Sequence, residues 1–286
     1  PLVSFYQQAY DAGSRNANEP AVSGEEMQAA KDFAQTAIVT FGRYSSEGSD
    51  RSSGKGDYML SDSEQALIDQ VVAAGFENVV VLFNVGGIID STWFKGNDDI
   101  SAVLMAWQGG MMGGLAMADV LCGDVTPSGK LTDTFAKNYT DYPASSNFAG
   151  NAFVNYEEDI YVGYRYFETI PGAYDKVNYE FGYGLSYTSF DISEVTAAQE
   201  GDDIVVTAKV TNTGAVAGKE VVQAYFSAPP GLLGKPAKEL GAYGKTGLLP
   251  PGGEETPIMR LPIAYMSSYD DLGHVAEAAY VMDDGA

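Results

Sequence analysis

The feature that most constrains this chain is the run Val79–Val85, Val-Val-Val-Leu-Phe-Asn-Val, which is almost wholly apolar. A strand with one face in water alternates apolar and polar residues, whereas a strand buried on both faces reads as a nearly continuous apolar run. Strands of the second kind are typical of parallel sheets, because helices cover both faces of such sheets. The run therefore indicates an α/β fold with a mostly parallel sheet.

Helix and strand patterns alternate around this run. The segments Ser23-Gly24-Glu25-Glu26 and Ser61-Asp62-Ser63-Glu64 both have the form of a capping box, so we expect a helix to begin at each. The first helix should end at about Phe33, and a short buried strand should follow over residues 37–41. The second helix should end at Gly75, where a glycine suits the C-cap.

A third helical stretch runs from about Gly113 to Leu121 and should end at Gly123. Helices and strands that alternate at these spacings predict a doubly wound α/β sandwich domain, which we assign to residues 1–165. A linking segment over residues 166–189 is rich in tyrosine and glycine.

The pattern changes after about Phe190. Residues 204–210 and 220–226 read as short strands rich in β-branched residues, and glycine and proline mark turns between such segments. Short strands with regular turns predict an all-β sandwich of immunoglobulin or fibronectin-III-like type over residues 190–286. Ala279–Met282 reads as the start of a strand, so we expect this sandwich to be incomplete at its C-terminal edge. Such an edge would pair with a further segment or with a second protomer in a homodimer.

The charge and the scarce ligand residues exclude several function classes. Sixteen Lys and Arg against thirty-nine Asp and Glu give a net charge of −23, which disfavours binding to nucleic acid or to an anionic membrane surface. Cys122 is the one cysteine and His274 the one histidine, so we expect neither a metal site nor a cofactor. The sequence shows no signal-peptide pattern at Pro1, which leaves the compartment open between cytoplasm and secretion.

Four segments together resemble one enzyme family. The segment Gly42-Arg43-Tyr44-Ser45-Ser46-Glu47-Gly48-Ser49-Asp50-Arg51 is similar to the Ser-Gly-Glu-Gly-x-Asp-Arg loop of family 3 glycoside hydrolases. Three further signatures of that family are matched, in the expected order, by residues 123–131, 154–166 and 179–188. The resemblance runs from about Ala37 to the C-terminus.

The resemblance implies an α/β sandwich followed by a fibronectin-like domain, with the active site between the sandwich and a separate (β/α)₈ barrel. The barrel would supply the nucleophilic aspartate and most contacts to the sugar. We see no barrel here, since the two domains use the whole chain and a barrel needs about 250 residues. The chain then resembles one part of a retaining exo-β-glycosidase of the β-glucosidase type, with a β-glucoside or cello-oligosaccharide as substrate. A β-xylosidase or another exo-β-glycosidase is the alternative enzyme, and a non-catalytic carbohydrate-binding or assembly module is the alternative of another class.

By motif position the resemblance makes Glu47 the general acid/base. A retaining glycosidase needs two carboxyl groups about 5 Å apart, one to attack the sugar and one to protonate the leaving oxygen. Glu47 follows a predicted buried strand, and sites in doubly wound sheets form at the carboxyl ends of strands. The small neighbours Ser46 and Gly48 would let the loop extend towards a partner domain. The alternative for Glu47 is a solvated loop carboxylate.

Other residues are expected to support the substrate loop. Tyr44 and Ser46 belong to the loop itself, and we expect Asp50 to neutralise Arg51 so that the pair shapes the loop without chemical action. Trp93 follows the end of a predicted strand and is a candidate platform for a sugar ring, with buried packing as the alternative.

Overall fold

The computed structural model of the chain describes residues 21–43, 51–148, 152–229 and 231–282. The fold divides into two compact units. The first contains the described residues up to Ala118 together with Phe135–Thr140, and the second contains most of the remainder, from Asp119 onwards. Each unit is described by itself.

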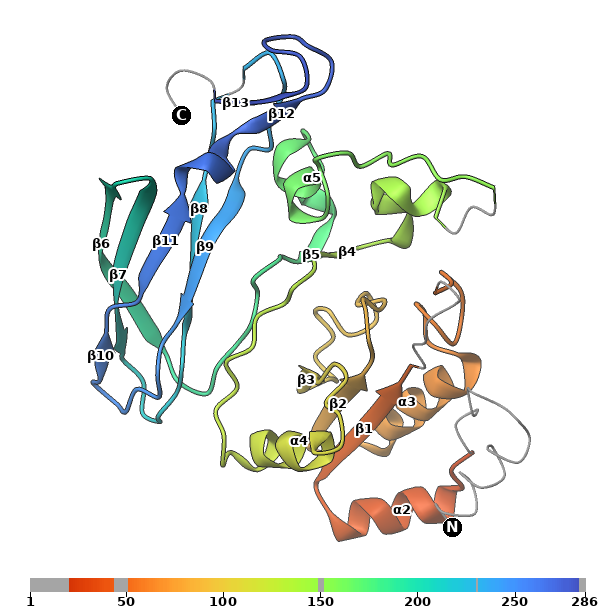
Figure 1. The fold of residues 1–286 in the computed structure, drawn as a ribbon. Helices are drawn as coiled ribbons and strands as arrows, with labels where there is room; N and C mark the ends of the chain where they lie inside the picture. Colours follow the sequence, from red (N-terminus) through yellow and green to blue (C-terminus); the bar gives the residue numbers. More distant parts are fainter. Residues whose placement is uncertain (1–20, 44–50, 149–151, 230, 283–286) are drawn as a thin grey trace. The chain divides into compact units, whose positions relative to one another are not determined.

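The first unit contains a three-stranded parallel sheet in the order β1-β2-β3, formed by β1 (Thr36–Gly42), β2 (Asn78–Asn84) and β3 (Ala102–Met105). Helix α3 (Asp62–Ala74) packs against β1, and α2 (Gly24–Phe33) lies beside α3 (Figure 1). The predicted α/β class and its parallel sheet are confirmed.

Both predicted capping boxes form. The hydroxyl of Ser23 accepts a hydrogen bond from the backbone N–H of Glu26, whose carboxylate accepts the backbone N–H of Ser23 in return. Ser61 and Glu64 repeat the arrangement at the start of α3. Helix α3 ends at Gly75, which has the left-handed φ of 73° that a residue with a side chain rarely adopts. Local sequence therefore fixes where these helices begin and where α3 ends.

Strand β2 lies at the centre of the sheet and is buried on both faces. Val81 and Phe83 are fully buried on one face, and Leu82 is buried on the other. Phe41 of β1 packs against Phe83, with ring centroids 5.9 Å apart. The continuous apolar run thus forms the core of the first unit, as its pattern predicts.

The segment after β3 contains mostly short elements. Helix α4 (Gly113–Cys122) matches the predicted third helix, and Gly123 follows it with a φ of 83°. Gly113 is the single buried residue of α4, although this helix is strongly apolar. The elements that follow are β4 (Phe135–Ala136), η1 (Tyr139–Asp141), η2 (Pro143–Ser146), α5 (Tyr164–Thr169), η3 (Tyr174–Lys176) and β5 (Val177–Tyr179).

The second unit contains the predicted antiparallel β-sandwich. Four strands form one sheet: β6 (Phe190–Glu200), β7 (Asp203–Asn212), β10 (Glu254–Glu255) and β11 (Ile258–Pro262). Two pairs accompany it: β8 (Val221–Phe226) with β9 (Glu239–Lys245), and β12 (Ser268–Asp270) with β13 (Ala279–Val281), while η4 (Ile263–Met266) follows β11. The predicted strands over 204–210 and 220–226 are β7 and β8, and the strand predicted to start at Ala279 is β13.

The core of the second unit is formed by side chains of both strand layers and of one turn. They are Ala208, Val210, Val222, Leu249 and Met259. These side chains come from β7, β8, β11 and the turn before Pro250, so residues far apart in the sequence share one core.

Asn212 is a fully buried polar residue beside this core. Its side-chain oxygen accepts hydrogen bonds from the Thr188 hydroxyl at 2.7 Å and from the Gly214 N–H at 3.1 Å. Its side-chain nitrogen donates to the carbonyls of Val216 at 2.9 Å and Leu249 at 2.8 Å. A buried amide is tolerated only when its donors and acceptor are paired, and this one ties together three separate turns.

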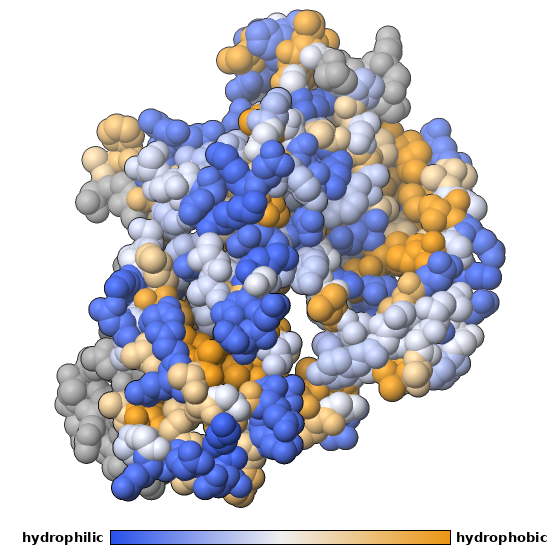
Figure 2. All heavy atoms as spheres, turned by 180° about the vertical axis from the view of Figure 1, so that it is seen from behind, coloured by the Kyte–Doolittle hydropathy of each residue, from blue (hydrophilic) through white to orange (hydrophobic). Residues whose placement is uncertain are grey.

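The surface seen in Figure 2 is largely hydrophilic, with separate areas of apolar side chains. Several of the exposed apolar residues are large, among them Phe33 at the end of α2 and Ile38 on β1. Within the described ranges, the helices are all too short or too polar to cross a lipid bilayer.

Replacing Asn212 by alanine tests the importance of this buried amide. We expect Asn212→Ala to lower the free energy of unfolding by about 2–4 kcal/mol, because buried carbonyls and a hydroxyl lose their partners. The measurement is urea unfolding followed by tyrosine fluorescence and circular dichroism, because both tryptophans, Trp93 and Trp107, belong to the first unit. Thr213→Ala, at the exposed neighbouring position, is the control and should change the stability by less than about 0.5 kcal/mol. Equal effects from the two variants would contradict the assignment.

Candidate active site

The carboxyl ends of the three parallel strands define the candidate site. Because β1, β2 and β3 run in the same direction, the segments that begin at Arg43, Val85 and Ala106 all leave the sheet at one edge. Ligand sites of open α/β sheets form at this edge. Arg51 and Trp93 lie on these segments. The other predicted site residues, Tyr44, Ser46, Glu47 and Asp50, lie outside the described residues.

Arg43 ends β1 with a buried ion pair. Its guanidinium contacts both carboxylate oxygens of Glu64, Nη1 to Oε1 at 2.5 Å and Nη2 to Oε2 at 2.9 Å. The two side chains are only 4% and 9% exposed. Arg43 also donates to the carbonyls of Gly42 at 2.8 Å and Asp57 at 2.7 Å. The charge is therefore removed from water but surrounded by acceptors, as a buried guanidinium requires.

Arg51 is anchored by the carboxylate of Asp57. Its Nε donates to Oδ1 of Asp57 at 2.6 Å, and its Nη1 donates to the carbonyl of Ile88 at 2.6 Å. The second oxygen of Asp57 accepts the backbone N–H of Ser52 at 2.5 Å. Sequence reasoning assigned the neutralising role to Asp50 and missed Asp57, since no spacing rule links residues across an irregular loop. The Asp50–Arg51 pair stays a prediction.

The guanidinium of Arg51 lies close to Gly87 in the loop after β2. A Cβ atom added to Gly87 would lie 2.8 Å from Nη1 of Arg51, which is closer than side-chain carbons approach. Nη2 of Arg51 is itself buried and contacts no acceptor within the described part of the chain. Two described groups, the Asp57 carboxylate and the Ile88 carbonyl, thus hold the guanidinium of Arg51 at this edge.

Trp93 packs against the aromatic core below this edge. Its ring meets Phe41 and Phe83 edge-on, with centroid separations of 6.0 Å in each case, and Phe94 at 5.1 Å. Its indole nitrogen is buried and has no hydrogen-bond acceptor among the described residues. These contacts are those of the packing alternative, and a role for Trp93 as a sugar platform stays a prediction.

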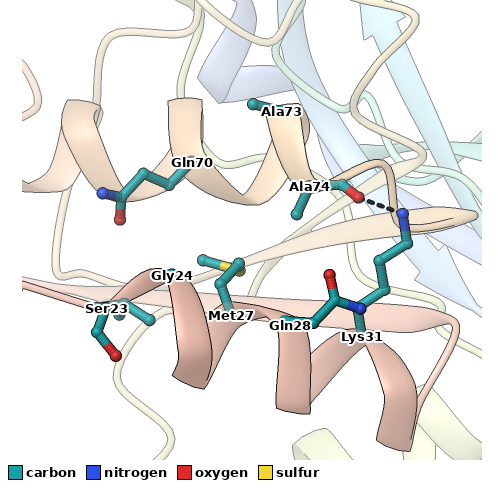
Figure 3. Close-up of a pocket in the computed structure, with 9 residues that line it drawn as sticks. Ser23, Gly24, Met27, Gln28, Lys31, Gln70, Ala73 and Ala74 are labelled. Atoms are coloured by element: carbon teal, nitrogen blue, oxygen red, sulfur yellow. Dashed lines mark hydrogen bonds between the residues drawn. The ribbon is translucent and has the colours of Figure 1, made fainter.

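A separate pocket of about 300 Å³ lies between α2 and α3 (Figure 3). Met27 of α2 points into it, and Lys31 crosses to α3, where its ammonium donates to the carbonyl of Ala74. The lining includes no aspartate, glutamate or histidine. The one ionisable side chain of the lining is Lys31, which is bound to the Ala74 carbonyl, and the pocket lies away from the carboxyl edge of the sheet. Elsewhere in the described ranges, no three His, Cys, Asp or Glu side chains are grouped as metal ligands.

Comparison with protein families identifies the chain. The glycosyl hydrolase family 3 C-terminal domain matches residues 3–187. The chain belongs to glycosyl hydrolase family 3. A fibronectin type III-like domain matches residues 220–285, which include β8, β9 and β11 to β13 of the second unit. The resemblance drawn from the four segments is confirmed.

Relatives and solved structures agree with this membership. This family 3 chain is 47% identical to β-glucosidase A of Butyrivibrio fibrisolvens over 93% of its length, and 36% identical to an exo-α-(1→6)-L-arabinopyranosidase of Bifidobacterium longum, also over 93%. The solved β-glucosidase of Paenibacillus barengoltzii superimposes with a TM-score of 0.88 at 42% identity and covers 99% of the chain. The chain spans 37%, 35% and 32%, respectively, of the lengths of these proteins.

The Arg43–Glu64 pair gives the first test of this site. We expect Glu64→Ala to lower the free energy of unfolding by about 3–5 kcal/mol, because it leaves a buried guanidinium without its counter-charge. Lys55→Gln, which removes the exposed ion pair between Lys55 and Asp62, should cost less than about 1 kcal/mol. Chemical unfolding of the family 3 chain measures both. A cost for Glu64→Ala no larger than that of the control would contradict a buried pair.

Proposed function

We propose that this chain supplies the general acid/base of a retaining exo-β-glycosidase of the β-glucosidase type, with Glu47 in that role. The nucleophilic aspartate belongs to a (β/α)₈ barrel outside this chain. The proposal rests on the position of the two residues that flank the Glu47 motif. Its two flanking arginines, Arg43 and Arg51, are fixed at the carboxyl edge of the parallel sheet. The family membership and the names of the relatives support the same reaction.

The chemistry assigns two successive tasks to this one carboxyl group. It protonates the glycosidic oxygen while the nucleophile attacks the sugar, and it then removes a proton from the water that releases the sugar. A catalytic acid must keep its proton near neutral pH, and an unpaired guanidinium beside it would oppose this. Asp57 balances the charge of Arg51, so the neighbouring cation is compatible with an acid at this edge.

Three carboxylates at the edge are already bound by neighbouring groups, which favours a nucleophile from elsewhere. Glu64 is bound by Arg43, and Asp57 by Arg51 and the Ser52 N–H. Asp90 accepts hydrogen bonds from the backbone and hydroxyl of Thr92 at 2.9 and 2.7 Å. A nucleophilic carboxylate must be free to bond to the sugar carbon. These three groups are held by the fold instead.

Exposed apolar surface supports a larger protein. Met111, Met112 and Leu115, at and before the start of α4, are 102%, 64% and 61% exposed. Grouped apolar side chains of this size mark surfaces that another protein segment covers. The barrel, as part of the same polypeptide or as a second chain, is our proposed partner. The boundaries 1–165, 166–189 and 190–286 and a homodimer through the edge of the sandwich remain predictions.

The substrate we propose is a β-glucoside or a cello-oligosaccharide. A β-xylosidase or another exo-β-glycosidase is the alternative, and the relative named as an exo-α-(1→6)-L-arabinopyranosidase is a reason to test more than one sugar. The barrel makes most sugar contacts in our proposal, so this chain does not decide the sugar. Comparison of aryl β-glucoside, β-xyloside and α-L-arabinopyranoside substrates, with the complete enzyme, distinguishes these possibilities.

The division of labour predicts that the purified chain by itself does not hydrolyse aryl β-glucosides, because it lacks the nucleophile. Activity should appear when the barrel polypeptide is present. Release of 4-nitrophenol from its β-glucoside measures this. Robust turnover by the chain alone would disprove the proposed division.

The role of Glu47 is tested in a chimera in which this chain replaces the matching third of the Paenibacillus barengoltzii β-glucosidase. We expect Glu47→Ala to lower kcat by about 10²–10⁴-fold, because proton transfer is lost. Azide should restore turnover by replacing water in the second step. Glu77→Ala, an exposed glutamate before β2, is the matched control and should retain full activity. Full activity of Glu47→Ala would favour the non-catalytic module. Sugar binding by the chain alone, measured by calorimetry, would also favour it if Glu47→Ala did not lower kcat.

A further inference from the structure

We propose that Asp57 is a positioning residue for the general acid/base, because it fastens both ends of the segment that carries Glu47. This inference rests on the proposed function. Residues 44–50 begin directly after Arg43 and end directly before Arg51, and these two arginines converge on Asp57.

The two ends use different atoms of Asp57. The backbone carbonyl accepts Nε of Arg43 at 2.7 Å, while Oδ1 accepts Nε of Arg51 at 2.6 Å. Oδ2 accepts the backbone N–H of Ser52 at 2.5 Å, so the carboxylate holds the main chain as well as the side chain at the second end. One residue thus fixes the spacing between the start and the end of the loop.

The fastening is attached to the rigid part of the unit. Arg43 is held by Glu64 at the first turn of α3, and Arg51 is held by the Ile88 carbonyl after β2. Both Arg43 and Glu64 are buried. The Arg51–Asp57 pair is 25% exposed on each side, so it is shielded from water only in part. The charge-assisted bonds are short and come from fixed neighbours, which favours one geometry.

A loop that carries a catalytic acid must place its carboxyl group accurately. Proton transfer requires the acid within hydrogen-bond reach of the leaving oxygen, and a shift of about 1 Å can cost about a hundredfold in rate. Release of one end of the loop should therefore affect the step that needs the proton more than the binding of the sugar.

The test uses two substrates in the chimeric enzyme. For Asp57→Ala we expect kcat/KM for cellobiose, whose leaving group needs a proton, to fall by about tenfold to a hundredfold. For 2,4-dinitrophenyl β-glucoside, whose leaving group departs without a proton, we expect a change of less than about threefold. Asp57→Asn keeps an acceptor for Arg51 and should give a smaller loss with the same selectivity. If Asp57→Ala does not fold, Asp57→Asn provides the test.

Lys55→Gln alters a neighbouring exposed ion pair and should leave both substrates unaffected. An equal loss on both substrates means that Asp57 only stabilises the fold, and no loss on either means that it does not position the loop. Both results overturn the inference. If Glu47→Ala shows the selectivity and Asp57→Ala does not, only this inference fails. If Glu47→Ala does not show it, the proposed function fails too.

Discussion

The buried pair between Arg43 and Glu64 is the interaction on which the rest of the first unit depends. A guanidinium and a carboxylate removed from water are stable only when each finds its full set of partners. Glu64 meets this condition by accepting Arg43 and the backbone N–H of Ser61 together, at the cap of α3. Arg43 meets it by adding the carbonyls of Gly42 and Asp57. The end of β1, the start of α3 and the loop between them therefore form one network.

That network explains how an irregular loop can carry a chemical group in a defined place. A loop that carries a functional group must have its ends held in place, and hydrogen bonds to fixed neighbours provide this. Here the anchors come from the sheet, whose central strand is the buried β2, and from the capped helix α3, which packs against β1. In our proposal, Asp57 and the two arginines position the acid of the family 3 reaction.

Local patterns predicted the elements that make their own contacts, and failed where the contacts come from afar. The capping boxes at Ser23 and Ser61 and the apolar run of β2 were sufficient to predict two helix starts and a buried strand. Each of these signals depends on a few adjacent residues. Strand β6 was not predicted: its alternation Phe190-Asp191-Ile192-Ser193 is short, and it is interrupted at the irregularity between Ser193 and Thr196. Asp57 was missed for a related reason, since its partners are brought together only when the loop folds back.

The sequence by itself determined the class of the fold, the family and the motif that contains Glu47, because burial patterns, caps and motif residues are properties of contiguous segments. The tertiary structure decided which charges meet. It paired Arg51 with Asp57, Arg43 with Glu64, and the buried Asn212 with three turns. The reason is that the free energy of a charge or a buried amide depends on every group around it in space, and those groups come from segments that are distant in the chain.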